Sequence, residues 1–215
     1  MNSPSPSEPR PRAQASLAII TCGAIGREAM DWAAGKDVAV YPLPPVLHNH
    51  PERIAPAVEA QIIRLRTLHD DVAVAYADCG SYGALDEVCE RHGVTRLPER
   101  HCYDLLSTPE TLDAQWAAEP GTFILIDFTV VAFDRMIWRE LGLDRHPELR
   151  DDYFGHFTKV IWLAGRQTPD LERAAERAAG RLGLPLEIWP VGASLDPHLT
   201  RLFASLGESD VQSKP

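Results

Sequence analysis

Short apolar runs alternate with amphipathic stretches along most of the chain. The apolar runs predict strands at 16–20, 37–43, 71–77, 93–98, 121–128, 157–165 and 184–192, of which 93–98 is the weakest. Apolar residues recur with helical spacing at 26–34, 51–68, 83–92, 169–182 and 197–206, which predicts helices there. Because most of the strands are apolar throughout, both of their faces should be covered. The pattern therefore predicts an α/β fold, a parallel sheet or sheets with helices on both faces.

Three stretches share one order of features: a strand, a turn of small residues and a helix. They are LAIITCGAIGREA, VAVAYADCGSYGALDEV and KVIWLAGRQTPDLERA, and the first two carry Cys-Gly in the turn. Such self-similarity is typical of chains built from repeated units. We therefore expect two or three similar βαβα units around a central site.

The two ends of the chain depart from this pattern. Residues 1–16 are rich in Pro and Ser and predict a disordered tail, 17–207 predict a single α/β domain, and 208–215 predict a flexible C-terminal tail. The start lacks the apolar centre of a signal peptide, and no apolar run reaches the roughly 18–20 residues that cross a bilayer. We therefore expect a cytoplasmic protein with no membrane partner, in which the four cysteines stay reduced.

Acidic residues outnumber basic ones, since 31 Asp and Glu against 21 Lys and Arg give a formal net charge of −10. The arginines are spread through the predicted helices near acids, as in DLERAAERAAGRL, and form no basic stripe. Sequence-independent binding to nucleic acid depends on such a stripe. Nucleic acid is therefore not an expected partner, and neither is an anionic membrane.

Reactive side chains gather where the predicted strands end. In chain order they are Cys22, His48, Asp78, Cys79, His101, Cys102 and Asp127. Ligands of open parallel α/β sheets bind at the carboxyl ends of the strands. Three of the four cysteines and one histidine are therefore predicted to lie on one rim.

Cys22 and Cys79 each stand before a glycine and the start of a helix. Unpaired N–H groups at such a position favour the thiolate, the form of cysteine that binds metals or attacks electrophiles. Thiolates with imidazole suit zinc, and thiolates alone suit iron–sulfur clusters. No C-x-x-C motif occurs, so separate loops would have to assemble the site. The alternative is that these cysteines fill space in the core, as Cys89 is expected to do inside its helix.

We expect a metal centre whose cofactor is a metal ion or an iron–sulfur cluster, with zinc and iron–sulfur as the preferred identities. Cys22, Cys79 and Cys102 would be thiolate ligands, and His48 would be a fourth ligand or a proton-transfer group. A metal with an open position would act on a small-molecule substrate as a Lewis acid or by activating water.

His101 and Asp127 are the expected orienting groups of that enzyme. Two other functions stay open. One is a non-catalytic accessory protein or carrier for a metal or cofactor. The other is a metal-free enzyme that uses Cys79 as nucleophile, with His48 or His101 as base.

The stretch LHNHPERI, residues 47–54, places two histidines before a proline. Pro51 suits the first position of a helix, with Asn49 or His50 as its cap. Glu52 is placed to complete a capping box from Asn49. His50 is therefore expected to belong to the helix start, and His48 to the site.

Six motifs together resemble the family called domain of unknown function 1638. They are TCGA, LHNHPERI, YADCGSYGALDEV, RHCYDLL, FILIDFTVVAFD and LRDDYFGHFTKVIWL, and the resemblance runs from Leu17 to Leu206. It implies a link to one-carbon metabolism. Family members occur in bacteria and methanogenic archaea, often in gene neighbourhoods with corrinoid-dependent methyltransferases. A corrinoid protein is thus a possible partner. The family motifs mark Cys22, His48, Asn49, Asp78, Cys79, Gly80, His101, Cys102 and Tyr103.

Overall fold

The computed structural model describes residues 15–192 and 195–212, so residues 1–14 of the tail predicted for 1–16 lie outside it. It contains two three-stranded sheets with strand orders β2-β1-β3 and β4-β5-β6. Every strand pair in both sheets is parallel. The fold is therefore α/β, which confirms the prediction from the hydrophobic pattern.

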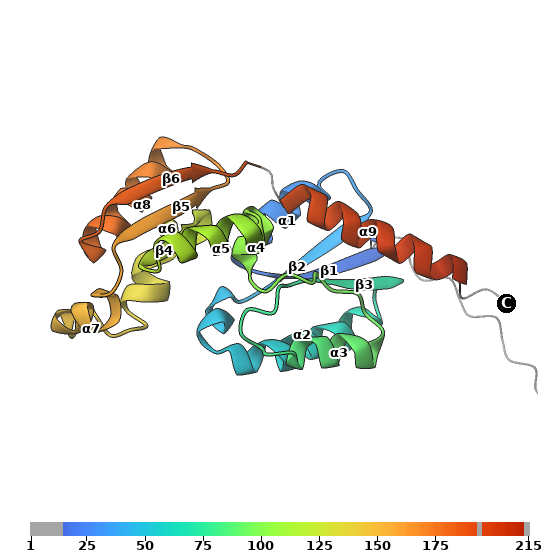
Figure 1. Cartoon of the computed structure of the whole chain (residues 1–215). Helices are drawn as coiled ribbons and strands as arrows, with labels where there is room; N and C mark the ends of the chain where they lie inside the picture. The colour runs from blue at the N-terminus through green and yellow to red at the C-terminus, as the bar shows by residue number, and fades with distance from the viewer. Residues whose placement is uncertain (1–14, 193–194, 213–215) are drawn as a thin grey trace, which may run out of the picture.

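The first sheet forms the N-terminal half of the molecule. Its strands are β1 (Leu17–Cys22), β2 (Val38–Leu43) and β3 (Asp71–Ala75). The helices that connect and follow them are α1 (Gly26–Ala33), α2 (Ile54–Leu65) and α3 (Ala84–His92). Figure 1 shows α2 and α3 on one side of this sheet and α1 with the C-terminal helix α9 (Leu195–Gln212) on the other. Both faces of the sheet are therefore covered, and all six residues of β1 are buried.

The predicted strand at 93–98 is reduced to a single bridge beside β3. Val74 donates its N–H to the Thr95 carbonyl (2.9 Å) and accepts from the Leu97 N–H (3.0 Å). A longer ladder is prevented at both ends, because Gly93 turns with a φ of 56° and Pro98 has no N–H to donate. The segment nevertheless runs parallel to β3 and leads toward the edge of the first sheet at which its strands end.

The second sheet is built from the C-terminal half. Its strands are β4 (Thr122–Ile126), β5 (Lys159–Ala164) and β6 (Leu186–Pro190). Its helices are α6 (Asp127–Phe133), α7 (Arg150–Phe154) and α8 (Pro169–Leu182), and a π-helical segment (Asp134–Trp138) continues α6. Two helices that the sequence reading did not anticipate, α4 (Cys102–Leu106) and α5 (Pro109–Ala118), connect the two sheets.

Each sheet with its helices is called a unit here, the first built on β1–β3 and the second on β4–β6. One face of the second sheet packs on α6 and α8, whereas its other face packs against the hydrophobic core of the first unit. Leu125 and Trp162 point to the former, and Ile124, Ile126 and Ile161 to the latter. The two units therefore share apolar packing. Their strand orders differ, because β1 lies at the centre of its sheet whereas β4 lies at an edge.

The last helix is longer than its hydrophobic pattern indicates. α9 begins at Leu195 and continues to Gln212, beyond the expected end at residue 206, and residues 213–215 lie outside the described part. No helix in the described residues is both long and apolar enough to span a membrane.

Candidate functional site

Cys22 ends β1, and the backbone turns sharply after it. Gly23 donates its N–H to the Leu43 carbonyl (2.9 Å), and a Cβ on Gly23 would come within 2.5 Å of that oxygen. The turn therefore requires glycine. It also lets the Ala24 N–H donate to the Sγ of Cys22 over 3.4 Å. Cys22 is thus held at the rim with its sulfur against the backbone that leads into α1.

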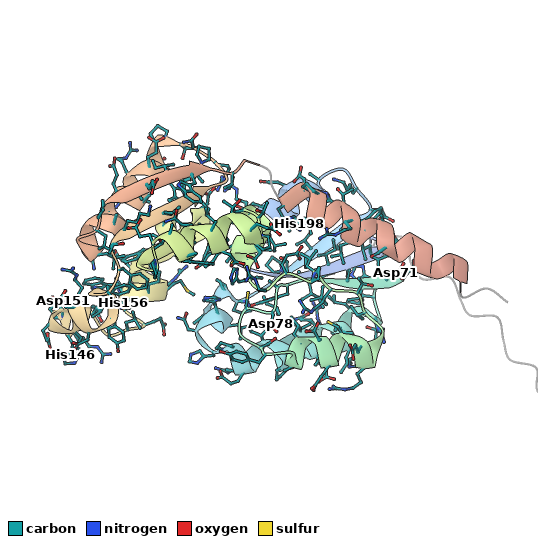
Figure 2. The ribbon with its side chains drawn as sticks, viewed as in Figure 1. Asp71, Asp78, His146, Asp151, His156 and His198 are labelled. Atoms are coloured by element: carbon teal, nitrogen blue, oxygen red, sulfur yellow. The ribbon has the colours of Figure 1, made fainter. Side chains whose placement is uncertain are left out.

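The loop between β3 and α3 is built around the Asp78 carboxylate (Figure 2). That carboxylate accepts hydrogen bonds from the Ser81 hydroxyl (2.6 Å) and from the N–H groups of Tyr82 (3.2 Å) and Gly83 (3.1 Å). Within this tight loop Cys79 has a φ of 48°. Left-handed backbone is uncommon for residues other than glycine and persists only where the surroundings hold it. Asp78 therefore fixes the position of Cys79.

Backbone hydrogen bonds place this loop against the segment that leads to Cys102. The Asp78 N–H donates to the Glu99 carbonyl (3.0 Å), and the Cys79 N–H donates to the Arg100 carbonyl (2.7 Å). Cys102 follows directly as the first residue of α4. Cys79 and Cys102 therefore meet although they come from different loops.

Three buried thiols surround one buried phenol at the rim of the first sheet. Cys22 is 4% exposed, Cys79 and Cys102 are each 7% exposed, and Tyr76 is 1% exposed. Burial, followed by interactions with all three thiols, raises the pKa of the Tyr76 hydroxyl, so all three lie within electrostatic reach of it. That hydroxyl has no partner at full hydrogen-bonding geometry among the described residues, although it is close enough to the Cys22 thiol for a weak hydrogen bond.

The three thiols differ in acidity. Burial raises the pKa of Cys22 to about 11. Interaction with Cys79, followed by burial, raises the pKa of Cys102 well above its usual value. Hydrogen bonding from Cys102 and then from His48 lowers the pKa of Cys79 to about 5, although burial opposes this. The same contact with Cys79 raises the pKa of His48. These shifts favour the thiolate form of Cys79 beside the Cys102 thiol, and they favour the protonated form of His48.

The cysteines share one region without forming a finished metal site. Among residues 15–192 and 195–212, no group of three or more His, Cys, Asp or Glu side chains is arranged so that it could hold a metal ion. Cys22, Cys79 and Cys102 would have to move their side chains to become ligands of one ion.

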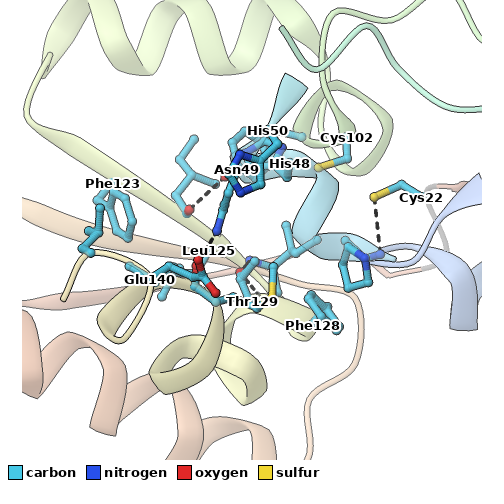
Figure 3. Close-up of a pocket in the computed structure, with 18 of the residues that line it drawn as sticks. Cys22, His48, Asn49, His50, Cys102, Phe123, Leu125, Phe128, Thr129 and Glu140 are labelled. Atoms are coloured by element: carbon cyan, nitrogen blue, oxygen red, sulfur yellow. Dashed lines mark hydrogen bonds between the residues drawn. The ribbon is translucent and has the colours of Figure 1, made fainter. Parts of the chain in front are cut away.

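A cavity of about 460 Å³ opens beside these thiols (Figure 3). Cys22, His48 and Cys102 contribute to its wall, whereas Cys79 does not. Most of the remaining wall comes from β4, α6, the π-helical segment and α7 of the second unit. The aromatic members are Tyr103, Phe123, Phe128, Tyr153 and Phe154. A largely apolar cavity of this size is typical of a small-molecule site.

His101 lies next to the cavity but does not line it. The residue precedes α4, and its ring packs against Tyr103 and Trp116 with centroid distances of 5.4 and 5.8 Å. Its Nδ1 is 3.4 Å from an Asp104 oxygen, without hydrogen-bonding geometry. The predicted orienting role of His101 stays a prediction.

Asp127 belongs to the rim of the second sheet, and the structure does not bring it into the cavity wall. Its carboxylate accepts hydrogen bonds from the Trp162 Nε1–H (3.0 Å), the Gly165 N–H (3.1 Å) and the Arg166 N–H (3.0 Å). These contacts tie the start of α6 to the end of β5. The arrangement explains why a carboxylate is buried here, and a role toward substrate stays a prediction.

The capping prediction for LHNHPERI is wrong. Residues 45–49 and 51–53 form two 3₁₀ turns, and α2 begins only at Ile54, without a side-chain cap. The Asn49 amide instead donates to the Met136 carbonyl of the π-helical segment (3.1 Å). His50 is exposed, lies 3.8 Å from Glu52 and lines the cavity together with His48, so the prediction that only His48 belongs to the site is wrong. A tertiary contact therefore takes the side chain that the local pattern assigned to a cap.

Two residues with a place at this site were not singled out from the sequence. Tyr76 lies among the thiols, and its position just before Asp78 at the end of a buried strand was the available signal. Glu140 lines the cavity from the segment after the π-helical turn. No motif marks Glu140, because the packing of the second unit against the first brings it there.

Comparisons with known proteins agree with the family resemblance. Residues 42–197 match the family described as protein of unknown function (DUF1638). The match includes His48, Cys79 and Cys102, whereas Cys22 lies before it. No curated protein sequence and no solved structure matches the chain. Because the family match spans well over half of the 215 residues, the chain belongs to the DUF1638 family.

Proposed function

We propose that this protein is a metal-dependent enzyme that acts on a small molecule, with zinc or an iron–sulfur cluster held by Cys22, Cys79 and Cys102. The observation that carries the proposal is the meeting of three cysteines from three separate rim loops around one buried hydroxyl. Soft thiolates select zinc and iron–sulfur clusters.

The residues present fit such a group in two further respects. The Tyr76 hydroxyl has only a weak contact with the Cys22 thiol, and sulfur atoms of a bound centre would accept its hydrogen bond. The lowered pKa of Cys79 favours the thiolate, the protonation state that a ligand needs. Metal binding would require the thiol side chains to rotate and Cys22 and Cys102 to lose their protons.

Residues of the cavity wall would hold a proton for the reaction and position the substrate. A bound metal would supply Lewis-acid chemistry beside the cavity. His48 lines the cavity, so it would hold a proton there and donate it to a substrate atom. The aromatic and aliphatic wall would exclude water and position the substrate.

Metal analysis of protein purified without oxygen tests the proposal. We expect zinc, or iron with sulfide and a visible absorption band, in the full-length chain. Cys22→Ser, Cys79→Ser and Cys102→Ser should each lose most of the metal, whereas Cys89→Ala should retain it. Cys89 is a matched control because it is also buried, at 3% exposure, but lies within α3. A folded, colourless and metal-free wild-type protein would contradict the proposal.

A second candidate is a metal-free enzyme with Cys79 as nucleophile. The contact between Cys79 and His48, which lowers the pKa of the thiol and raises that of the imidazole, favours it, as does the left-handed backbone at Cys79. It predicts that Cys79 alone is alkylated rapidly at neutral pH and that chelators have no effect on turnover. The metal analysis above separates the two candidates.

A further inference from the structure

The lining of the cavity beside the thiols combines a few reactive side chains with many apolar ones. Cys22, Cys102 and His48 belong to the lining, and most of its other residues are aromatic or aliphatic. Neither lysine nor arginine is among the described residues that line it. Glu140 supplies the one carboxylate of that described lining.

The Glu140 carboxylate is available to a ligand. It has no ion-pair partner among the residues that the structure describes. Glu140, Phe123 and Phe128 all line the cavity (Figure 3). The Phe123 ring is fixed edge-on to Phe154, with centroids 5.4 Å apart and an interplanar angle of 84°. A carboxylate is therefore combined with ordered aromatic rings in one wall.

Aromatic faces together with a carboxylate are the combination that recognises organic cations. The negative face of a ring attracts a cation within about 6 Å of its centroid, and quaternary ammonium groups are bound in such aromatic surroundings. The net charge of −10 would also draw cations toward the protein.

We infer that this cavity binds a small organic cation, an ammonium or quaternary ammonium group on an apolar body, with the cationic group between Glu140 and the aromatic rings. The inference rests on the proposed function in taking the cavity as the substrate site. It names the class of substrate for that site.

Calorimetric titration of the full-length, metal-free protein with two isosteric probes tests the inference. Choline carries a quaternary nitrogen, and 3,3-dimethylbutan-1-ol has a neutral carbon in its place. At physiological salt, which screens surface charges, we expect choline to bind about tenfold more tightly or better. Equal affinities, or no binding of either probe, would overturn the inference.

Two variants test whether the preference for choline over the neutral probe arises in the cavity. Glu140→Gln should reduce choline affinity about tenfold and leave the affinity for the neutral probe unchanged. Glu90→Gln removes an exposed carboxylate from α3, outside the cavity, and should keep the preference. A preference that survives Glu140→Gln would also overturn the inference. Because the titration needs no metal, its outcome is independent of the metal analysis that tests the proposed function.

Discussion

The side-chain amide of Asn49 donates a 3.1 Å hydrogen bond to the backbone carbonyl of Met136. This bond joins the loop after β2 to the π-helical segment of the second unit, and both residues line the cavity. Short π-helical stretches occur frequently at functional sites. The two walls of the cavity are therefore held in place by a contact between residues far apart in the sequence.

Asn49→Ala should weaken this connection. A neutral hydrogen bond contributes about 0.5–1.5 kcal/mol, so we expect a loss of that size in the free energy of unfolding, measured by urea titration. His50→Ala is the matched control, because His50 is exposed and its 3.8 Å contact with Glu52 should contribute less than about 0.5 kcal/mol. Equal effects of the two substitutions would show that the bond does not hold the units together.

The ionisation of Cys79 gives a second prediction. Because its pKa is lowered to about 5, the metal-free protein should gain one thiolate as the pH rises through about 5, seen as ultraviolet absorption. Cys22 and Cys89, whose pKa values burial raises to about 11, should gain theirs only in strong alkali.

Two substitutions test whether the ultraviolet transition near pH 5 comes from Cys79. Cys79→Ser should abolish it. His48→Gln should move it to higher pH, because it replaces a donor that can carry a positive charge with a neutral one. A transition near the ordinary cysteine pKa in the wild-type protein would show that the thiol is not activated.

A structural role for Asp127 gives a third prediction. Asp127→Ala leaves three N–H donors without their acceptor in a buried region, so we expect a loss of about 3 kcal/mol in the free energy of unfolding. Asp134→Ala is the control. Its carboxylate pairs with Arg181 at 3.2 Å on the surface, and such a pair contributes less than about 1 kcal/mol. A loss at Asp127 no larger than at Asp134 would contradict the structural role.

The parts of the site that follow from strand ends could be predicted from the sequence. Cys22, His48, Cys79 and Cys102 each follow a strand or bridge of the first sheet, and parallel strands bring their carboxyl ends to one edge. Asp127 satisfies the same rule but belongs to the second sheet. The hydrophobic pattern does not say which strands share a sheet. The pattern alone therefore could not show that Asp127 lies on a different sheet from the three cysteines and His48.

The cavity could not be predicted, because packing between the two units creates it. Asn49 carries a local capping signature, yet its amide bonds to Met136 of the other unit. Glu140 has no local signature and reaches the cavity only through the fold of the second unit. Local patterns predicted the helices and strands and the residues at the carboxyl edge of the first sheet. Tertiary contacts determine which residues of the second unit line the cavity beside that edge.

The buried hydroxyl of Tyr76 gives the last prediction. In the metal-free protein Tyr76→Phe removes a hydroxyl that has only a weak contact with the Cys22 thiol, so the free energy of unfolding should change by less than about 1 kcal/mol. In the metal-loaded protein the same substitution should be destabilising, because the hydroxyl would then lose a sulfur acceptor.

Tyr41→Phe is the matched control for this comparison. Its hydroxyl is 2.7 Å from the Nε2 of His69, away from the thiols, so the substitution should cost about 1 kcal/mol with or without metal. Urea titrations of both variants in both states make the comparison. If Tyr76→Phe has the same effect in both states, its hydroxyl does not interact with a bound centre, and the fit of the thiol cluster to a metal loses its main independent support.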